Sequence, residues 1–149
     1  MKTFTDNAGR SWTLAVNVNA IKRVRELLDV DLASTADGDE KSKRLLAQLM
    51  VDPILLCDVV YCVCKPEADK LGITDEDFGR AMAGDAIGQA REALLAELVN
   101  FSPSQDQRRI AQKAVEKLKT MEAKAMAHVE RQIDDPRIDA LIDSHLAEL

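Results

Sequence analysis

Residues 52–65, Asp-Pro-Ile-Leu-Leu-Cys-Asp-Val-Val-Tyr-Cys-Val-Cys-Lys, form the most apolar stretch of the chain and decide its fold. Asp52 followed by Pro53 predicts a helix start, because aspartate caps helices and proline suits the first helical position. The helix that follows is apolar on nearly every face, so we expect it to be central and buried. We expect Pro66 to end it. Asp58 interrupts the stretch, which is also too short to span a bilayer.

The residues before this helix predict a β-hairpin. Phe4 precedes a polar turn at residues 6–10, where Gly9 can adopt the positive φ that a tight turn needs. Apolar and polar side chains then alternate from Ser11 to Val16, which is typical of a strand. A lone hairpin is marginally stable in water, so we expect Trp12 to be substantially buried against the helix that follows.

The rest of the chain reads as helices. Further helix starts are expected at Asn17 or Asn19, at Thr74, at Ser102-Pro103 and at Asp135-Pro136. Residues 33–40 are small and polar, and we expect an exposed, mobile loop there. We therefore predict a mainly α fold, an N-terminal β-hairpin packed on a bundle of about seven helices. It is one domain overall, with a core at 1–101 and a C-terminal helical extension at 102–149; whether the extension packs on the core is left open.

Composition and charge narrow the class of protein. The chain has 149 residues, of which 46% are hydrophobic and only 3% aromatic, so aliphatic side chains must fill the core. The net charge of −6 repels phosphate backbones, and we read the basic groups at 22–25 and 108–109 as solvated helix faces. Nucleic acid is therefore not the expected partner. The polar start of the chain predicts no secretory signal, and with the unpaired cysteines it indicates the cytoplasm.

The cysteines are expected to be buried structural thiols. Their spacing is Cys-x4-Cys-x-Cys, with Cys57 and Cys64 on one helix face, and both histidines lie far along the chain. Zinc sites use other spacings, and no local base activates a thiol nucleophile. We also find no phosphate-binding, dinucleotide-binding, nucleophile-elbow or zinc-protease motif, so we expect no enzyme, no metal and no cofactor.

Two acidic features need separate interpretation. A possible calcium loop has carboxylates at loop positions 1, 3, 9 and 12, which are Asp29, Asp31, Asp37 and Glu40. Such a loop also requires an oxygen ligand at position 5 and a glycine at position 6, where this chain has Ala33 and Ser34. We therefore reject calcium binding. Asp58 has two interpretations, an exposed strip of its helix or a buried carboxylate paired with a basic residue.

The long C-terminal helix carries a seam of small and apolar residues at alternating three- and four-residue steps from Ala111 to His128. Helices this amphipathic need a groove or a partner to cover them. The candidate partner-binding surface is Leu118, Met121, Ala125, Met126 and His128.

The order of elements resembles that of the tail assembly chaperones of long-tailed bacteriophages and prophages. Four segments carry the resemblance, which covers roughly the first 100 residues: Phe4–Trp12, Ala20–Leu28, Asp52–Asp58 and Asp75–Met82. It implies a non-enzymatic, self-associating protein of the host cytoplasm that binds the helical tape measure protein, keeps it soluble and recruits tail-tube subunits. The alternatives are a structural virion component, such as a tail or head-completion protein, and a helical regulatory or DNA-binding protein.

Overall fold

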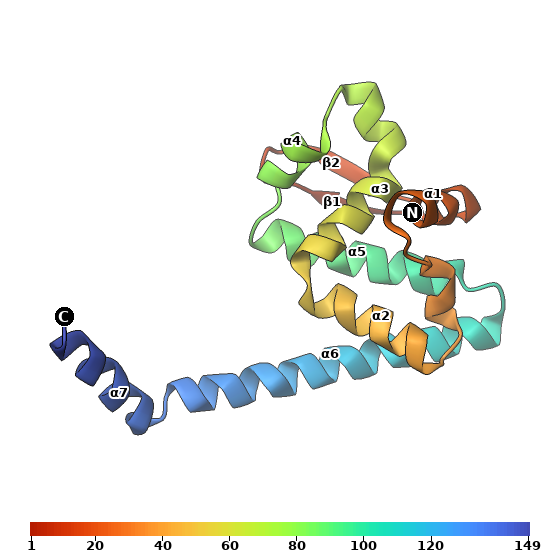
Figure 1. Cartoon of the computed structure of the whole chain (residues 1–149). Helices are drawn as coiled ribbons and strands as arrows, with labels where there is room; N and C mark the ends of the chain where they lie inside the picture. Colours follow the sequence, from red (N-terminus) through yellow and green to blue (C-terminus); the bar gives the residue numbers. More distant parts are fainter. The chain divides into compact units, whose positions relative to one another are not determined.

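The computed structural model describes residues 1–149, apart from the side chain of Ala36. Strands β1 (Lys2–Thr5) and β2 (Ser11–Leu14) form an antiparallel hairpin, and helices make up most of the remainder (Figure 1). The mainly α fold with an N-terminal hairpin is thus confirmed. The helices are α1 (Val18–Leu28), the 3-10 helix η1 (Leu32–Ala36), α2 (Glu40–Val51), α3 (Pro53–Leu71), α4 (Asp75–Arg80), α5 (Asp85–Phe101), α6 (Gln105–Ile133) and α7 (Pro136–Ala147).

The chain forms two compact units, Met1–Val115 and Glu116–Leu149. The division lies inside α6, after Val115, rather than after Phe101. The physical reason is that Ala111 and Val115, in the first turns of α6, are buried residues of the N-terminal unit.

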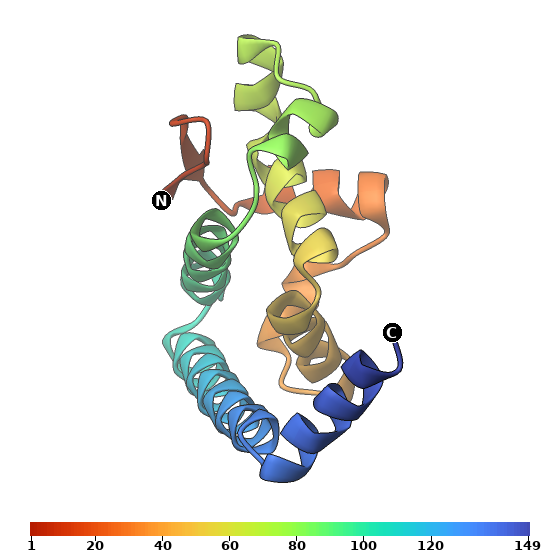
Figure 2. The ribbon, with the colours of Figure 1, turned by 90° about the vertical axis from the view of Figure 1, so that its left-hand side faces the viewer.

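Helix α3 is the centre of the N-terminal unit. It contacts α1, α2, α4, α5 and β2, as Figures 1 and 2 show from two directions. Leu56, Val59 and Val60 on this helix are almost completely buried. The predicted central position of this apolar stretch is confirmed, and it follows from a surface that offers water few polar groups.

Helix α3 does not end where the sequence predicted. Pro66 lies inside it, and the helix continues to Leu71. Proline has no N–H to donate to the carbonyl four residues earlier, which belongs to Cys62. The guanidinium of Arg23 on α1 supplies the missing donor, with Arg23 Nη1 donating to Cys62 O at 2.9 Å and to Val63 O at 3.2 Å. A partner from another helix thus satisfies the break, so the helix continues.

The hairpin is tied to the core through its aromatic side chains and its turn. Trp12 is fully buried, as predicted, but the predicted partner is wrong: the hairpin packs mainly on α5 and α3, whereas α1 packs on α3. The Trp12 ring lies edge-on to Phe78 of α4 at 5.4 Å between centroids. Phe4 and Tyr61 also contact Phe78, so four of the few aromatic residues meet at one point. Gly9 has a φ of +81°, which supports its predicted role in the turn.

A buried carboxylate closes the hairpin. Asp6 Oδ2 accepts from Trp12 Nε1 and from Arg10 Nε, both at 2.9 Å, and Asp6 Oδ1 accepts from the backbone N–H of Ala8 and Arg10. Burial raises the pKa of Asp6, but the hydrogen bonds from Trp12 and Arg10 outweigh it, so that the pKa lies below its ordinary value. The carboxylate therefore stays ionised inside the turn.

Two other sequence predictions need correction. Residues 33–36 of the segment predicted to be an exposed loop belong to η1, where Ser34 and Thr35 are buried and the Asp31 side chain caps the first turn. Residues 37–40 are exposed, as predicted. The longest helix begins at Gln105 rather than at Ser102-Pro103, because the Ser104 hydroxyl accepts from Gln107 N at 3.1 Å.

The other predicted caps are confirmed. They are Asn17 for α1, Asp52 for α3, Thr74 with a capping box for α4, and Asp135 for α7.

In the described part of the chain, no single helix has the length and apolarity to cross a bilayer; α2 and α3 meet that test only as a pair, bent by 100° at their junction.

Candidate functional site

The C-terminal unit displays a stripe of exposed apolar side chains along α6. With 100° between successive residues, Leu118, Met121, Ala125 and Val129 fall within an arc of about 80°. Met121 is 56% exposed, Ala125 is exposed, and Leu118 is half-buried. These side chains form a continuous surface on one face of the helix, and a partner helix is the shape that such a stripe accommodates.

The stripe is wider than the sequence predicted. Met126, which is 63% exposed, lies at one border with Ile133, and the exposed His128 lies at the opposite border. Val129 and Ile133 were missed among the candidate binding residues. The signal was present, because 126, 129 and 133 repeat the three- and four-residue steps of an apolar helix face.

Helix α7 carries a second stripe. None of the residues of this helix is buried. Its large apolar side chains fall at helical spacing, and they are Ile138, Leu141, Ile142 and Leu146. Asp135 caps the helix by accepting from Arg137 N at 2.8 Å, and its carboxylate also forms an ion pair with the Arg137 guanidinium. The polar start therefore fixes where the helix begins, while its apolar face is left exposed.

The cysteines lie in and near the core of the N-terminal unit. Cys62 and Cys64 are buried, and Cys57 is half-buried. Burial raises the pKa of the Cys64 thiol to about 12, and its Sγ donates to Thr13 O at 3.7 Å. A thiol with this pKa is protonated at neutral pH, which suits the structural role that the sequence predicted for it.

Acidic residues in and beside the rejected calcium loop have separate structural roles. Asp31 accepts from the Arg25 guanidinium at 2.8 Å and caps η1, while Asp39, close by in sequence, caps α2. Asp29 ends α1 in a left-handed conformation with φ of 55°. Among the described side chains, no three histidine, cysteine or acidic groups are placed to hold a metal ion.

Asp58 fits neither of its two interpretations fully. It is half-buried and lies in a surface depression with an apolar lining that includes Ile54, Phe78 and Met82. Burial raises its pKa, and the nearby carboxylates of Asp75 and Asp52 raise it further. Its electrostatic neighbours are therefore acidic, and the basic partner of the buried alternative is not found among the described residues.

No protein-family model, curated protein or solved structure matches this chain.

Proposed function

We propose that this protein is a non-enzymatic protein-binding protein that holds an apolar helical partner on the stripes of α6 and α7. The single observation that carries the proposal is the row of large exposed apolar side chains in the C-terminal unit, from Met121 to Leu146. Water contact with such side chains is unfavourable by about 25 cal/mol per Å² of apolar surface. A partner that covers the stripes removes that contact.

The kind of partner follows from the shape and charge of this surface. A helix face with small and flexible side chains, such as Ala125 and Met126, adapts to varied apolar helices. Residues 116–133 carry four basic and three acidic side chains, whereas residues 134–149 carry one basic and five acidic. A partner helix that contacts α7 is therefore expected to have lysine or arginine beside its apolar face.

We further propose that the protein is a tail assembly chaperone of a long-tailed phage or prophage. In this role it binds the helical tape measure protein in the host cytoplasm, keeps it soluble and recruits tail-tube subunits. Support comes from the resemblance of the hairpin and the helices after it, and from exposed stripes that suit a long amphipathic helix. The same proposal includes association of this chain with further copies of itself.

The test is co-expression with the proteins encoded beside it, followed by light scattering on the material that co-purifies. A soluble complex with a long helical neighbour, with several copies of this chain per partner, is the expected result. The absence of such a complex would contradict the chaperone role. Recovery of the chain in purified particles at fixed stoichiometry would instead identify a structural virion component.

A matched pair of variants links the complex to the stripe. Ala125 lies within the stripe of α6. Ala127 lies on the opposite face of the same helix, about 160° around the helix axis from Ala125. Ala125→Glu is expected to weaken partner recovery by about tenfold or more, because it buries a carboxylate in an apolar contact. Ala127→Glu has the same change in charge and volume, and it should leave recovery nearly unchanged.

A further inference from the structure

The β-hairpin has two outer edges, and the hydrogen-bond pattern shows which main-chain groups lie along each. Asp6 N donates to Arg10 O, so Asp6 and Arg10 form a hydrogen-bonded pair. Hydrogen-bonded and non-hydrogen-bonded pairs alternate along an antiparallel ladder, so the pair of Thr3 and Thr13 is non-hydrogen-bonded. Thr13, opposite Thr3, therefore directs its N–H and C=O away from β1. By the same alternation, Thr3 and Thr5 direct theirs away from β2.

Helix α3 covers the outer edge of β2. Thr13 N donates to Glu67 Oε2 at 3.3 Å, and Thr13 O accepts from Cys64 Sγ at 3.7 Å. Two side chains thus satisfy the main-chain groups at the middle of this edge. No strand has room to pair there without displacing them.

The outer edge of β1 is different. Thr3 and Thr5 are exposed, and within the described part of the chain no other group bonds to their outward N–H and C=O. A row of unpaired main-chain groups of this kind is a template for another strand. The open edge therefore belongs to β1 alone.

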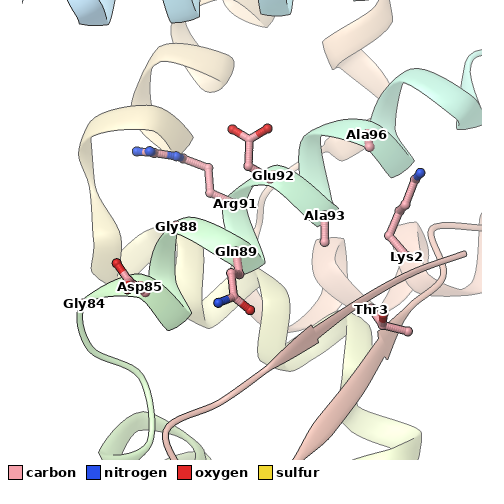
Figure 3. A pocket seen from close by; sticks show the side chains of 10 residues that line it. All are labelled: Lys2, Thr3, Gly84, Asp85, Gly88, Gln89, Arg91, Glu92, Ala93 and Ala96. Atoms are coloured by element: carbon pink, nitrogen blue, oxygen red, sulfur yellow. The ribbon is translucent and has the colours of Figure 1, made fainter.

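A depression of about 710 Å³ lies between β1 and α5, where Lys2 and Thr3 form one side (Figure 3). The α5 side combines the small residues Gly88, Ala93 and Ala96 with polar side chains at the rim, which are Asp85, Gln89, Arg91 and Glu92. The three small residues leave space above the helix for the side chains of a neighbouring segment.

We propose that an extended segment of a partner polypeptide adds to β1 as a third strand, pairing with the main chain of Thr3 and Thr5. Alternate side chains of that segment enter the depression over Gly88 and Ala96, because successive side chains of a strand point to opposite faces. The main chain supplies the affinity, and the space above the small residues of α5 selects side chains that fit the depression.

A second copy of this chain is a poorer occupant. In a β1–β1 pair, the side chain in the middle of the added strand would be Phe4, which is buried to 3% exposure in its own core and contacts Phe78. It has no freedom to enter the depression of its neighbour.

The experiment is an NMR titration of the ¹⁵N-labelled full chain with three seven-residue probes. Each probe is an acetylated and amidated peptide in which threonine alternates with valine, leucine or phenylalanine, with lysine at both ends. The expected result is a downfield shift and slower hydrogen exchange of the Thr3 and Thr5 amides, with Ser11 and Thr13 unchanged. A fully N-methylated probe keeps the side chains, but it has no N–H donors and its N-methyl groups obstruct the approach of another strand to its carbonyl groups, so it should not shift these amides.

Two outcomes overturn the proposal. One is an absence of change at Thr3 and Thr5 with all three probes, and the other is an equal response to the N-methylated probe, which would mean that binding does not require strand pairing. Pairing of the free protein with itself would appear as protected Thr3 and Thr5 amides in a dimer without any probe, and it would also overturn the choice of occupant.

A pair of proline variants tests the same edge. Thr3→Pro removes one outward N–H from β1 without removing a β1–β2 hydrogen bond. It should weaken the affinity for the best-binding probe by about fivefold to tenfold, because one hydrogen bond is lost. Ser11→Pro makes the same change on the outer edge of β2 and should leave probe affinity unchanged. Equal loss in both variants would overturn the assignment of the edge.

Discussion

Helices α5 and α7 carry the same kind of apolar face, but one face is covered and the other is exposed. Leu94 and Leu95 of α5 are at most 1% exposed, whereas Leu141 and Leu146 of α7 are 58% and 60% exposed. Residue type and helical spacing are therefore alike in the two regions. The difference teaches that an amphipathic pattern identifies a face, while the elements or partners that surround it decide whether the face is buried.

The same comparison separates two sources of stability. Helix α5 belongs to a core in which α3 and β1 contact it, so burial contributes to its free energy of folding. Helix α7 has 12 residues and no buried side chain, and isolated helices of that length are marginal in water. A partner on its stripe would stabilise α7 as well as bind to it.

The largest predicted effect concerns the N-terminal unit. Trp12→Ala removes the largest fully buried side chain, so we expect a loss of about 3–5 kcal/mol in the free energy of unfolding. Urea denaturation followed by circular dichroism measures it, because the variant has no tryptophan for fluorescence. Ile54→Ala, at a position 74% exposed, is the control and should cost less than about 1 kcal/mol. A loss below about 1 kcal/mol for Trp12→Ala would mean that the hairpin is detached from the core.

A matched pair of leucines tests the comparison between the two helices. Leu94→Ala should cost about 2–5 kcal/mol, because it opens a cavity in the core. Leu141→Ala should change the free energy of unfolding by no more than about 0.5 kcal/mol, as exposed substitutions usually do. Thermal or urea unfolding of both variants gives the values. If the Leu141 variant lost as much as the Leu94 variant, its side chain would already be covered in the free protein, and the contrast would not hold.

A third prediction concerns the carboxylate inside the hairpin turn. Asp6→Asn should cost about 1.5–3 kcal/mol at pH 7, because charge-assisted bonds from Trp12 and Arg10 are lost. The folded pKa of Asp6 is lowered from 3.8, so its stabilisation is present above that pH and is lost as the pH falls through the folded pKa. The difference between wild type and variant should therefore shrink below pH 3.8. A difference that is independent of pH would assign the effect to shape rather than charge.

Much of the fold could be predicted from local sequence, because the determining interactions are local. The turn glycine and the caps at Asn17, Asp52, Thr74 and Asp135 act within a few residues, and the apolar stretch after Pro53 identifies the central helix. Pro66 misled the prediction for a tertiary reason. Its missing donor is replaced by Arg23, which is 39 residues from Cys62 in sequence, and no local pattern reveals that contact.

The candidate site could be predicted only in part. Periodicity located the stripe on α6, and the same steps would have extended it to Val129 and Ile133. No pattern in the sequence indicated the open edge of β1. It depends on Glu67 and Cys64 covering β2 while β1 is left uncovered, which is a property of the packed structure.

The smallest predicted effect is a gain in stability, at Asp58 of the N-terminal unit. Its pKa is raised by burial and by Asp75 and Asp52, so its ionised form disfavours folding at pH values above that raised pKa. Asp58→Asn should therefore raise the free energy of unfolding by about 0.5–1 kcal/mol at pH 7. The gain should vanish as the pH falls below 3.8, where the wild-type carboxyl is also neutral, and the part due to neighbouring charges should decrease in salt. A loss of stability would mean that the carboxylate has a favourable partner, and the buried, paired interpretation of Asp58 would then stand.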